Sequence, residues 1–144
     1  MQRAGASDTT TLMANAYLDS GKRGPVSAPA EVPASPKIPF QAFAQLDLRV
    51  GKILTVEDIP TARKPLYKFT IDFGALGIRQ CAGGIKVYYT KEQLVGKLVV
   101  AVLNLEPKPI AGVLSECMML ASFTDTDLAL LRPDKEMPPG TKVA

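Results

Sequence analysis

The fold is decided by the stretch Leu46-Asp-Leu-Arg-Val-Gly-Lys-Ile-Leu-Thr-Val56. At its start Leu46, Leu48 and Val50 alternate with polar residues, which is the period of a β-strand with one buried face. Gly51 then interrupts the alternation before the apolar pattern resumes. A glycine inside a strand predicts a β-bulge or the sharp bend of a small barrel.

More strands follow the first one at short intervals. Tyr67–Phe73 alternates apolar and polar residues and is the cleanest strand pattern in the chain. Leu98–Leu103 is apolar throughout, which predicts a central strand buried on both faces. Shorter strands are expected at 78–82, 117–121 and 128–131, with a loop at 104–109 and a terminal turn at 138–142.

A short helix is predicted between the third and fourth strands. Thr90-Lys-Glu-Gln93 fits a capping box, and Gly96 stands where a helix C-terminal glycine belongs. Short strands with one such helix predict an all-β fold, a five-stranded OB-fold barrel with terminal extensions, a fold that often binds oligonucleotides. An open α+β sheet is the competing architecture.

The chain divides near residue 39. Residues 1–39 are rich in proline, alanine and serine, which predicts a disordered N-terminal tail. Residues 40–144 are then the folded domain. Phe40, Phe43 and Leu46 follow Pro39 at helical spacing, so a short helix that docks an aromatic face is expected there.

Composition excludes the kinds of catalysis that need histidine, while carboxylate, lysine and cysteine chemistry remain possible. The 144 residues include no histidine, which removes Ser-His-Asp and Cys-His catalysis and every zinc site that needs an imidazole. Cys81 and Cys117 form no CxxC motif and are expected to be buried, reduced thiols. No glycine-rich phosphate loop is present, so no cofactor and no metal are expected. The longest apolar run, Leu98–Leu103, is too short to span a membrane, and the chain is predicted to be cytoplasmic.

Net charge is only +3, so any nucleic-acid site must be a local cluster of cations. If the barrel forms, its basic residues could line one groove together with the tyrosines near Lys86; they are Arg49, Lys52, Arg63, Lys64, Lys68, Arg79, Lys86 and Lys108. The alternative is that these cations lie on an ordinary solvated barrel surface and that the tyrosines are buried. Composition alone does not favour either the binding groove or the solvated surface.

Several motifs in order carry a family resemblance. They are Phe43–Ile53, Tyr67–Gly74, Gly77–Gln80, Leu94–Lys97, and Asn104–Gly112 followed by Ser115-Glu116. Over residues 40–144 the chain resembles the structure-recognising tRNA-binding domain. That OB-fold module occurs as a stand-alone dimer and appended to methionyl- and phenylalanyl-tRNA synthetases.

Within that family the chain is most similar to the CsaA-type export chaperones, on 71–74, 76–80, 109–116 and 132–142. The resemblance implies a homodimer and, in that branch, binding of unfolded preproteins. It implies a dimer interface that contains Phe40, Phe43, Leu46, Leu128 and Leu130. One departure is Cys81-Ala-Gly-Gly84, where that branch usually has a Ser-Ser-Ala-Gln-like stretch, so a pocket there is expected to be wider and less polar.

The sequence therefore predicts a non-catalytic, homodimeric protein that binds tRNA or structured RNA. Four cations (Lys52, Arg79, Lys86 and Lys108) would meet phosphates, and Asn104 and Ser115 would be polar readers. Glu116 would accept a hydrogen bond from a base amine or a peptide N–H. The alternative is a CsaA-like chaperone for unfolded polypeptide, in which Met118 would contact apolar side chains of the client.

Overall fold

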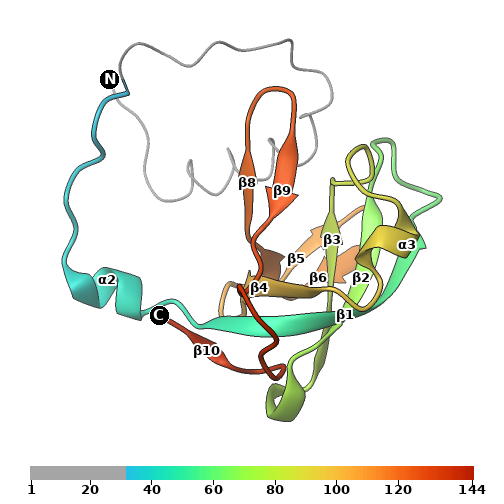
Figure 1. Cartoon of the computed structure of the whole chain (residues 1–144). Helices are drawn as coiled ribbons and strands as arrows, with labels where there is room; N and C mark the ends of the chain where they lie inside the picture. The colour runs from blue at the N-terminus through green and yellow to red at the C-terminus, as the bar shows by residue number, and fades with distance from the viewer. Residues whose placement is uncertain (1–31) are drawn as a thin grey trace.

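The structure is a computed structural model, and it describes residues 32–144. The described chain is almost entirely β-structure (Figure 1). Its two α-helices, α2 (Phe40–Ala44) and α3 (Lys91–Leu94), are short, and a turn of 3-10 helix spans Gly74–Leu76. The barrel strands are β1 (Leu48–Asp58), β2 (Tyr67–Asp72), β3 (Ile78–Gly83), β4 (Leu98–Val102) and β7 (Met118–Met119). The other short strands are β5 (Lys108–Ile110), β6 (Val113–Ser115), β8 (Ala121–Phe123), β9 (Leu128–Leu130) and β10 (Lys142–Val143).

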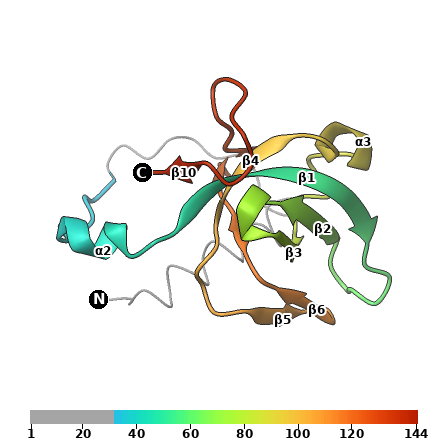
Figure 2. The same ribbon diagram turned by 90° about the horizontal axis from the view of Figure 1, so that it is seen from below.

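The strands form an antiparallel sheet in the order β3-β2-β1-β4-β7, which curls until its two edges approach (Figure 2). β1 is long enough to pair with β4 near its start and with β2 further along. At the seam, the backbone N–H of Glu116 donates to the carbonyl of Gln80 at 2.9 Å and so links the segment after β6 to β3. The result is a nearly closed five-stranded barrel of the OB type, as predicted, with α3 between β3 and β4.

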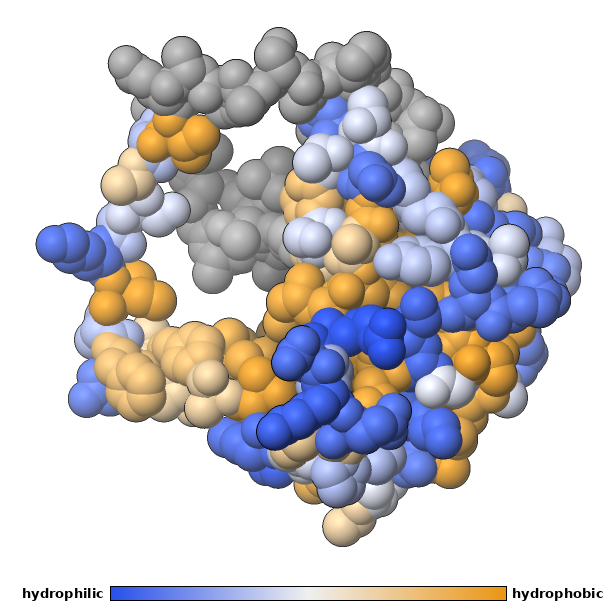
Figure 3. All heavy atoms as spheres, viewed as in Figure 1, coloured by the Kyte–Doolittle hydropathy of each residue, from blue (hydrophilic) through white to orange (hydrophobic). Residues whose placement is uncertain are grey.

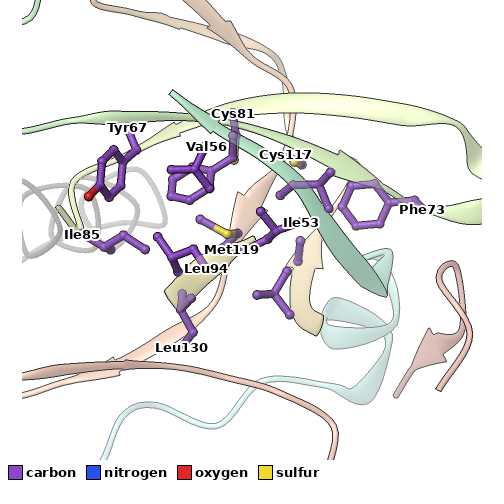
Figure 4. Close-up of a cluster of buried hydrophobic side chains, with 14 of the residues drawn as sticks. Ile53, Val56, Tyr67, Phe73, Cys81, Ile85, Leu94, Cys117, Met119 and Leu130 are labelled. Atoms are coloured by element: carbon purple, nitrogen blue, oxygen red, sulfur yellow. The ribbon is translucent and has the colours of Figure 1, made fainter. Parts of the chain in front are cut away.

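The barrel interior is filled by inward-facing residues of several strands (Figure 4). Phe69, Ile71 and Phe73, in and just after β2, are fully buried, while the residues between them are partly exposed. All five residues of β4 are buried, which confirms the central strand expected from the apolar run. Burial of a large apolar side chain stabilises a fold by about 1.5–3 kcal/mol. This row of three side chains therefore contributes a large part of the stability that keeps the sheet curled.

Gly51 does not mark the irregularity in β1. The register shift lies further along the strand, between Ile53 and Thr55, so the prediction of a bulge at the glycine is wrong by a few residues. The glycine serves close packing instead. A Cβ at this position would lie 2.5 Å from Cε1 of Phe73 and 2.6 Å from Cγ2 of Ile71. The absent side chain lets the aromatic ring pack directly on the backbone of the first strand.

The predicted helix between the third and fourth strands is confirmed as α3. Its N-cap, Thr90, accepts from the backbone N–H of Gln93 at 3.3 Å, and the Gln93 side chain accepts from the N–H of Thr90 at 2.8 Å. Gly96 follows the helix with a φ of +85°, a conformation that glycine adopts without a steric penalty. Leu94, the last residue of α3, is fully buried and packs in the hydrophobic core of the barrel.

Two short strands outside the barrel, β5 and β10, were not predicted from the sequence. The loop expected at 104–109 continues into β5, which pairs with β6 in a hairpin turning at Ala111 and Gly112. Both turn residues have positive φ, 50° and 85°, as a two-residue hairpin turn of type I′ requires. At the C-terminus, the expected turn leads into β10, which pairs with β1. Strands of two or three residues are too short for alternation to be recognised.

The strand predicted at 117–121 is divided in two. Met118 and Met119 form β7 and pair with β4, whereas Ala121 begins β8 and pairs with β9. Between them the N–H of Leu120 donates to the carbonyl of Val100 at 2.9 Å. The chain therefore leaves the barrel at this point and forms the β8–β9 hairpin, which projects away from it in Figure 1.

The first 31 residues of the predicted tail lie outside the described residues. Residues 32–39 have no helix or strand and are exposed. α2 forms where the helical spacing predicted it, but none of its residues is buried, so it does not dock on the barrel of its own chain. Phe40 is 73% exposed and Phe43 38% exposed, and their ring centroids are 6.1 Å apart. Figure 3 shows α2 as a largely apolar projection beside the barrel.

Two of the residues expected at a dimer interface belong to the core. Leu128 and Leu130 are 4% and 8% exposed and pack in the barrel interior of the same chain. Their side chains therefore offer little surface to a second copy, and a place for them at a dimer interface stays a prediction. β9 alternates, so Ala129 between them is the residue that faces outward.

The two cysteines are free and buried, as expected. A hydrogen bond with the side chain of Cys117, together with burial, raises the pKa of Cys81 well above its ordinary value. The wider, less polar pocket expected at this stretch stays a prediction, and two of its positions leave little free space. Cys81 lies in the core, and a Cβ on Gly83 would meet the Phe69 ring at 3.1 Å, so the ring fills the space that the glycine leaves.

The described part of the chain contains no helix long and apolar enough to cross a membrane. Over the same residues, no group of three or more His, Cys, Asp or Glu side chains could hold a metal ion. The expectation that the protein needs no cofactor stays a prediction.

The close packing at Gly51 predicts a large effect of a single methyl group. Gly51→Ala should lower the free energy of unfolding by about 1–3 kcal/mol, because Phe73 and Ile71 must move to admit the new Cβ. Thr55→Ala, at an exposed position of the same strand, should change it by no more than about 0.5 kcal/mol. Urea denaturation followed by circular dichroism measures both. Equal effects of the two substitutions would contradict the packing role of the glycine.

Candidate nucleic-acid interface

Two loops lie side by side at one end of the barrel. The first connects β1 to β2 and has the sequence Thr61-Ala-Arg-Lys-Pro65. The second is the β5–β6 hairpin, which lies below β2 and β3 in Figure 2. The hydroxyl of Thr61 donates to the carbonyl of Ala111 at the tip of the hairpin, at 3.5 Å. These are the two loops that, with the face of strands 2 and 3, bind oligonucleotides in OB folds.

A row of residues crosses the outer surface from β1 to β5. Glu57 pairs with Lys68, Lys68 pairs with Ala82, and the N–H of Ala82 donates to the hydroxyl of Ser115 at 3.3 Å. Ser115 in turn pairs with Lys108. Neighbouring strands are about 4.8 Å apart, so three such steps place the backbones of Lys68 and Lys108 roughly 14 Å from each other. We call Arg63, Lys68 and Lys108 the basic face.

The cations of the basic face are available to a ligand. Within residues 32–144, Arg63, Lys68 and Lys108 make no ion pair with an acidic side chain. Arg63 and Lys108 are exposed, and Lys68 is half-buried. All three were among the cations expected to line one groove, but only Lys108 was also expected to meet a phosphate. The signal for Arg63 and Lys68 was the basic sequence of the β1–β2 loop and the outward face of the cleanest strand.

Lys86 is engaged in a charge cluster near this end. Its Nζ lies 2.9 Å from Oδ1 of Asp58, and Nζ of Lys91 lies 2.8 Å from Oδ2 of the same carboxylate. The ammonium of Lys86 also lies 5.7 Å from the centroid of the Tyr67 ring. Hydrogen bonds from Lys91 and Lys86 lower the pKa of Asp58, and Asp58 raises the pKa of Lys91. Two cations on one anion leave a net positive charge beside the basic face.

Lys52 lies near the middle of β1, away from the end that carries Asp58. Six residues separate it from Asp58 along the strand, or about 20 Å. It lines a hollow together with Asp72 and Glu136 and with apolar residues of the C-terminal segment. Two carboxylates and one ammonium make this hollow a poor place for a phosphate, so the structure does not bring Lys52 together with Lys86 and Lys108.

The predicted polar readers are occupied within the protein. Asn104 accepts from the N–H of Asp47 at 2.8 Å and donates to the carbonyl of Gln45 at 2.6 Å. Arg79 donates from its guanidinium to the carbonyl of Leu103 at 3.2 Å. These hydrogen bonds hold Leu103 and Asn104, the two residues that directly follow β4.

Ser115 and Glu116 are also occupied, at the barrel seam. Oε1 of Glu116 accepts from the N–H of Gln80 at 3.1 Å, beside the backbone bond already described. The hydroxyl of Ser115 accepts from Ala82, as noted above. Met118, in β7, is half-buried and pairs with Val102. A role for these residues in ligand binding stays a prediction.

A barrel of this type with a cationic loop face defines an OB-fold binding domain. Comparison of the sequence with protein-family models matches residues 48–142 to the family described as "Putative tRNA binding domain". This match covers most of the chain. The chain therefore belongs to the tRNA-binding domain family.

Similar proteins fall into two groups. The methionine–tRNA ligase of Pyrococcus horikoshii is 48% identical over 106 residues, which are 74% of this chain and 14% of that enzyme. The methionine–tRNA ligase of Methanosarcina acetivorans is 45% identical over 109 residues, 75% of this chain and 15% of the enzyme. This chain thus spans about one seventh of the length of these relatives.

Solved structures add the second group. The chaperone CsaA of Bacillus anthracis str. Ames superposes with a TM-score of 0.69 and 37% identity, covering 76% of this chain and 100% of the other. A MetRS related protein from Pyrococcus horikoshii gives a TM-score of 0.70 and 31% identity, with the same two coverages. The chain is therefore a tRNA-binding domain close to CsaA.

The Asp58 cluster predicts a measurable titration. The lowered pKa means that Asp58 stabilises the fold fully above its ordinary value of 3.8, and that this contribution is lost as the pH falls through the lower pKa of the folded state. NMR titration of the carboxyl carbon should therefore give a midpoint below 3.8. In the double variant Lys86→Gln/Lys91→Gln the midpoint should return toward 3.8. An identical midpoint in both proteins would contradict the ion pairs.

Proposed function

We propose that this protein binds tRNA, or RNA folded to a similar shape, through the basic face and without catalysis. The observation that carries the proposal is that Lys68 and Lys108 lie in one row on a tRNA-binding domain and that neither makes an ion pair within residues 32–144. Arg63 extends the same face from the β1–β2 loop, which touches the hairpin. We place this binding in the cytoplasm, where tRNA is used.

The chemistry of the row favours phosphate over base recognition. Glu57, Lys68, Ala82, Ser115 and Lys108 include no aromatic side chain on which an unpaired base could stack. Lysine and arginine contacts to phosphates fix a protein on an RNA by its shape, without reading sequence. Each such contact releases counterions, so affinity falls steeply as salt rises.

We also propose that two copies act together through α2. Phe40, Phe43 and Leu46 are 73%, 38% and 36% exposed, which is unusual for large apolar side chains on neighbouring positions of one short segment. Burial of these side chains against a second copy would remove apolar surface from water. A dimer would present two basic faces and so raise the avidity for one RNA.

A CsaA-like role in binding unfolded polypeptide is the second candidate. Ile78 and Leu114 are 62% and 46% exposed, and the amide of Gln80 joins their strands by donating to the carbonyl of Leu114 at 3.1 Å. Exposed apolar side chains next to the basic face could contact an extended client. The structural likeness to the CsaA chaperones supports this candidate as well.

Binding of tRNA should depend on the two cations of the row. Lys68→Gln and Lys108→Gln should each weaken binding of total tRNA about threefold to tenfold. Each should also reduce the slope of log affinity against log salt by about 0.7–0.9, because one phosphate contact is lost. Fluorescence anisotropy at several salt concentrations measures both quantities. Lys135→Gln removes the same charge from an exposed position of the C-terminal segment and should change neither.

The same titration separates the two candidate functions. With tRNA as the ligand, an unfolded, uncharged peptide should not displace the labelled RNA. Affinity that is equal at low and high salt, or displacement by the peptide together with suppressed aggregation of a denatured client, would contradict RNA binding and favour the chaperone.

The dimer should depend on the exposed aromatic pair. Phe40→Glu/Phe43→Glu should convert the protein to a monomer in sedimentation equilibrium, since two carboxylates would then have to be buried between the copies. Ile78→Glu places the same charge at an exposed apolar position of β3 and should leave the mass unchanged. A monomeric parent protein would overturn the proposed interface.

A further inference from the structure

We propose that Arg79, Asn104, Ser115 and Glu116 are positioning residues that hold Lys108 on the basic face and do not touch the RNA. We call them the anchor residues. The proposal rests on the proposed function, because it assigns these residues a role in the same site. It reverses the expectation from the sequence, in which they were readers of the ligand.

The hairpin that carries Lys108 needs anchors because it stands outside the main sheet. β5 and β6 form a two-stranded sheet of their own, with three paired residues on each strand. A two-stranded hairpin alone is at best marginally stable in water. The position of Lys108 relative to Lys68 must therefore be set by bonds between the hairpin segment and the barrel.

The anchor residues provide those bonds at both ends of the segment. Where the chain leaves β4, Arg79 holds the carbonyl of Leu103, and Asn104 binds the backbone of Asp47 and Gln45 on the approach to β1. The amide of Asn104 uses both its oxygen and its nitrogen in this way.

The returning end of the hairpin is anchored at the seam. Glu116 accepts from the N–H of Gln80, and Ser115 accepts from the N–H of Ala82. These two side chains take the place of ladder bonds along the outer edge of β3. The hydroxyl of Ser115 also donates to the carbonyl of Cys117 at 3.4 Å.

This role explains why a carboxylate lies so close to a phosphate-binding face. A free Glu116 would repel the RNA backbone, but here its oxygen is engaged by a backbone N–H of β3. The bond holds the segment next to Lys108 in place. A cation that is already held in position loses less entropy when it meets a phosphate.

A double-mutant cycle on the full chain tests the proposal, with total tRNA as the probe. Glu116→Ala should weaken binding about threefold to tenfold and reduce the salt slope by about 0.7–0.9, as Lys108→Gln does. The double variant should bind no more weakly than Lys108→Gln alone, because both changes remove one contact. Glu116→Gln keeps an oxygen that can accept from Gln80 and should remain within about twofold of the parent protein.

The outcomes separate this proposal from the function on which it rests. If the two losses multiply in the double variant, or if Glu116→Gln binds as weakly as Glu116→Ala, Glu116 acts on the RNA directly and positioning is overturned. If Lys108→Gln leaves both the tRNA affinity and the salt slope unchanged, the proposed phosphate contact at Lys108 is itself overturned. Ser115→Ala, a smaller change at the same seam, gives the same test should Glu116→Ala not fold.

Discussion

The barrel closes through very few bonds. One backbone hydrogen bond joins Glu116 to Gln80, and the carboxylate of Glu116 returns a second bond to the N–H of the same residue. The β1–β2, β1–β4 and β2–β3 ladders each have five or six paired residues, and β4–β7 has two. A side chain thus completes the sheet where the backbone cannot, and the placement of the β5–β6 hairpin beside β3 follows from that closure.

The closure also sets the distribution of charge. Because the hairpin is held beside β3, Lys108 on its outer strand lies in the same row as Lys68 on β2. Lys52, on the same strand as Asp58 but six residues before it, lies beside the carboxylates of Asp72 and Glu136. The local electrostatic potential around each lysine therefore depends on strand register. The number of lysines in the sequence does not predict it.

The sequence predicted the parts of the fold that local periodicity determines. Alternation identified β1, β2 and the buried β4, and the pairing of Thr90 with Gln93 identified α3. Partner choice beyond the local pattern could not be predicted. Leu128 and Leu130 looked like any apolar strand, and only the register of β9 shows that they face the interior of their own chain. A polar residue in a motif does not reveal whether its partner is a ligand or the protein's own backbone, and Asn104 and Ser115 both bind backbone groups here.

A net charge of only +3 is compatible with phosphate binding, because acidic groups near the basic face are engaged within the protein. Asp58 is held between two lysines, and Glu116 is held by a backbone N–H. Asp58 lowers the positive potential of the face less than a free carboxylate would, because its charge is matched at contact distance by two ammonium groups. A few cations on a rigid row can then create a positive field of short range, about the Debye length of 8 Å at physiological salt. Such a field acts on a phosphate only when the rest of the ligand fits the barrel surface, so weak total charge favours recognition by shape.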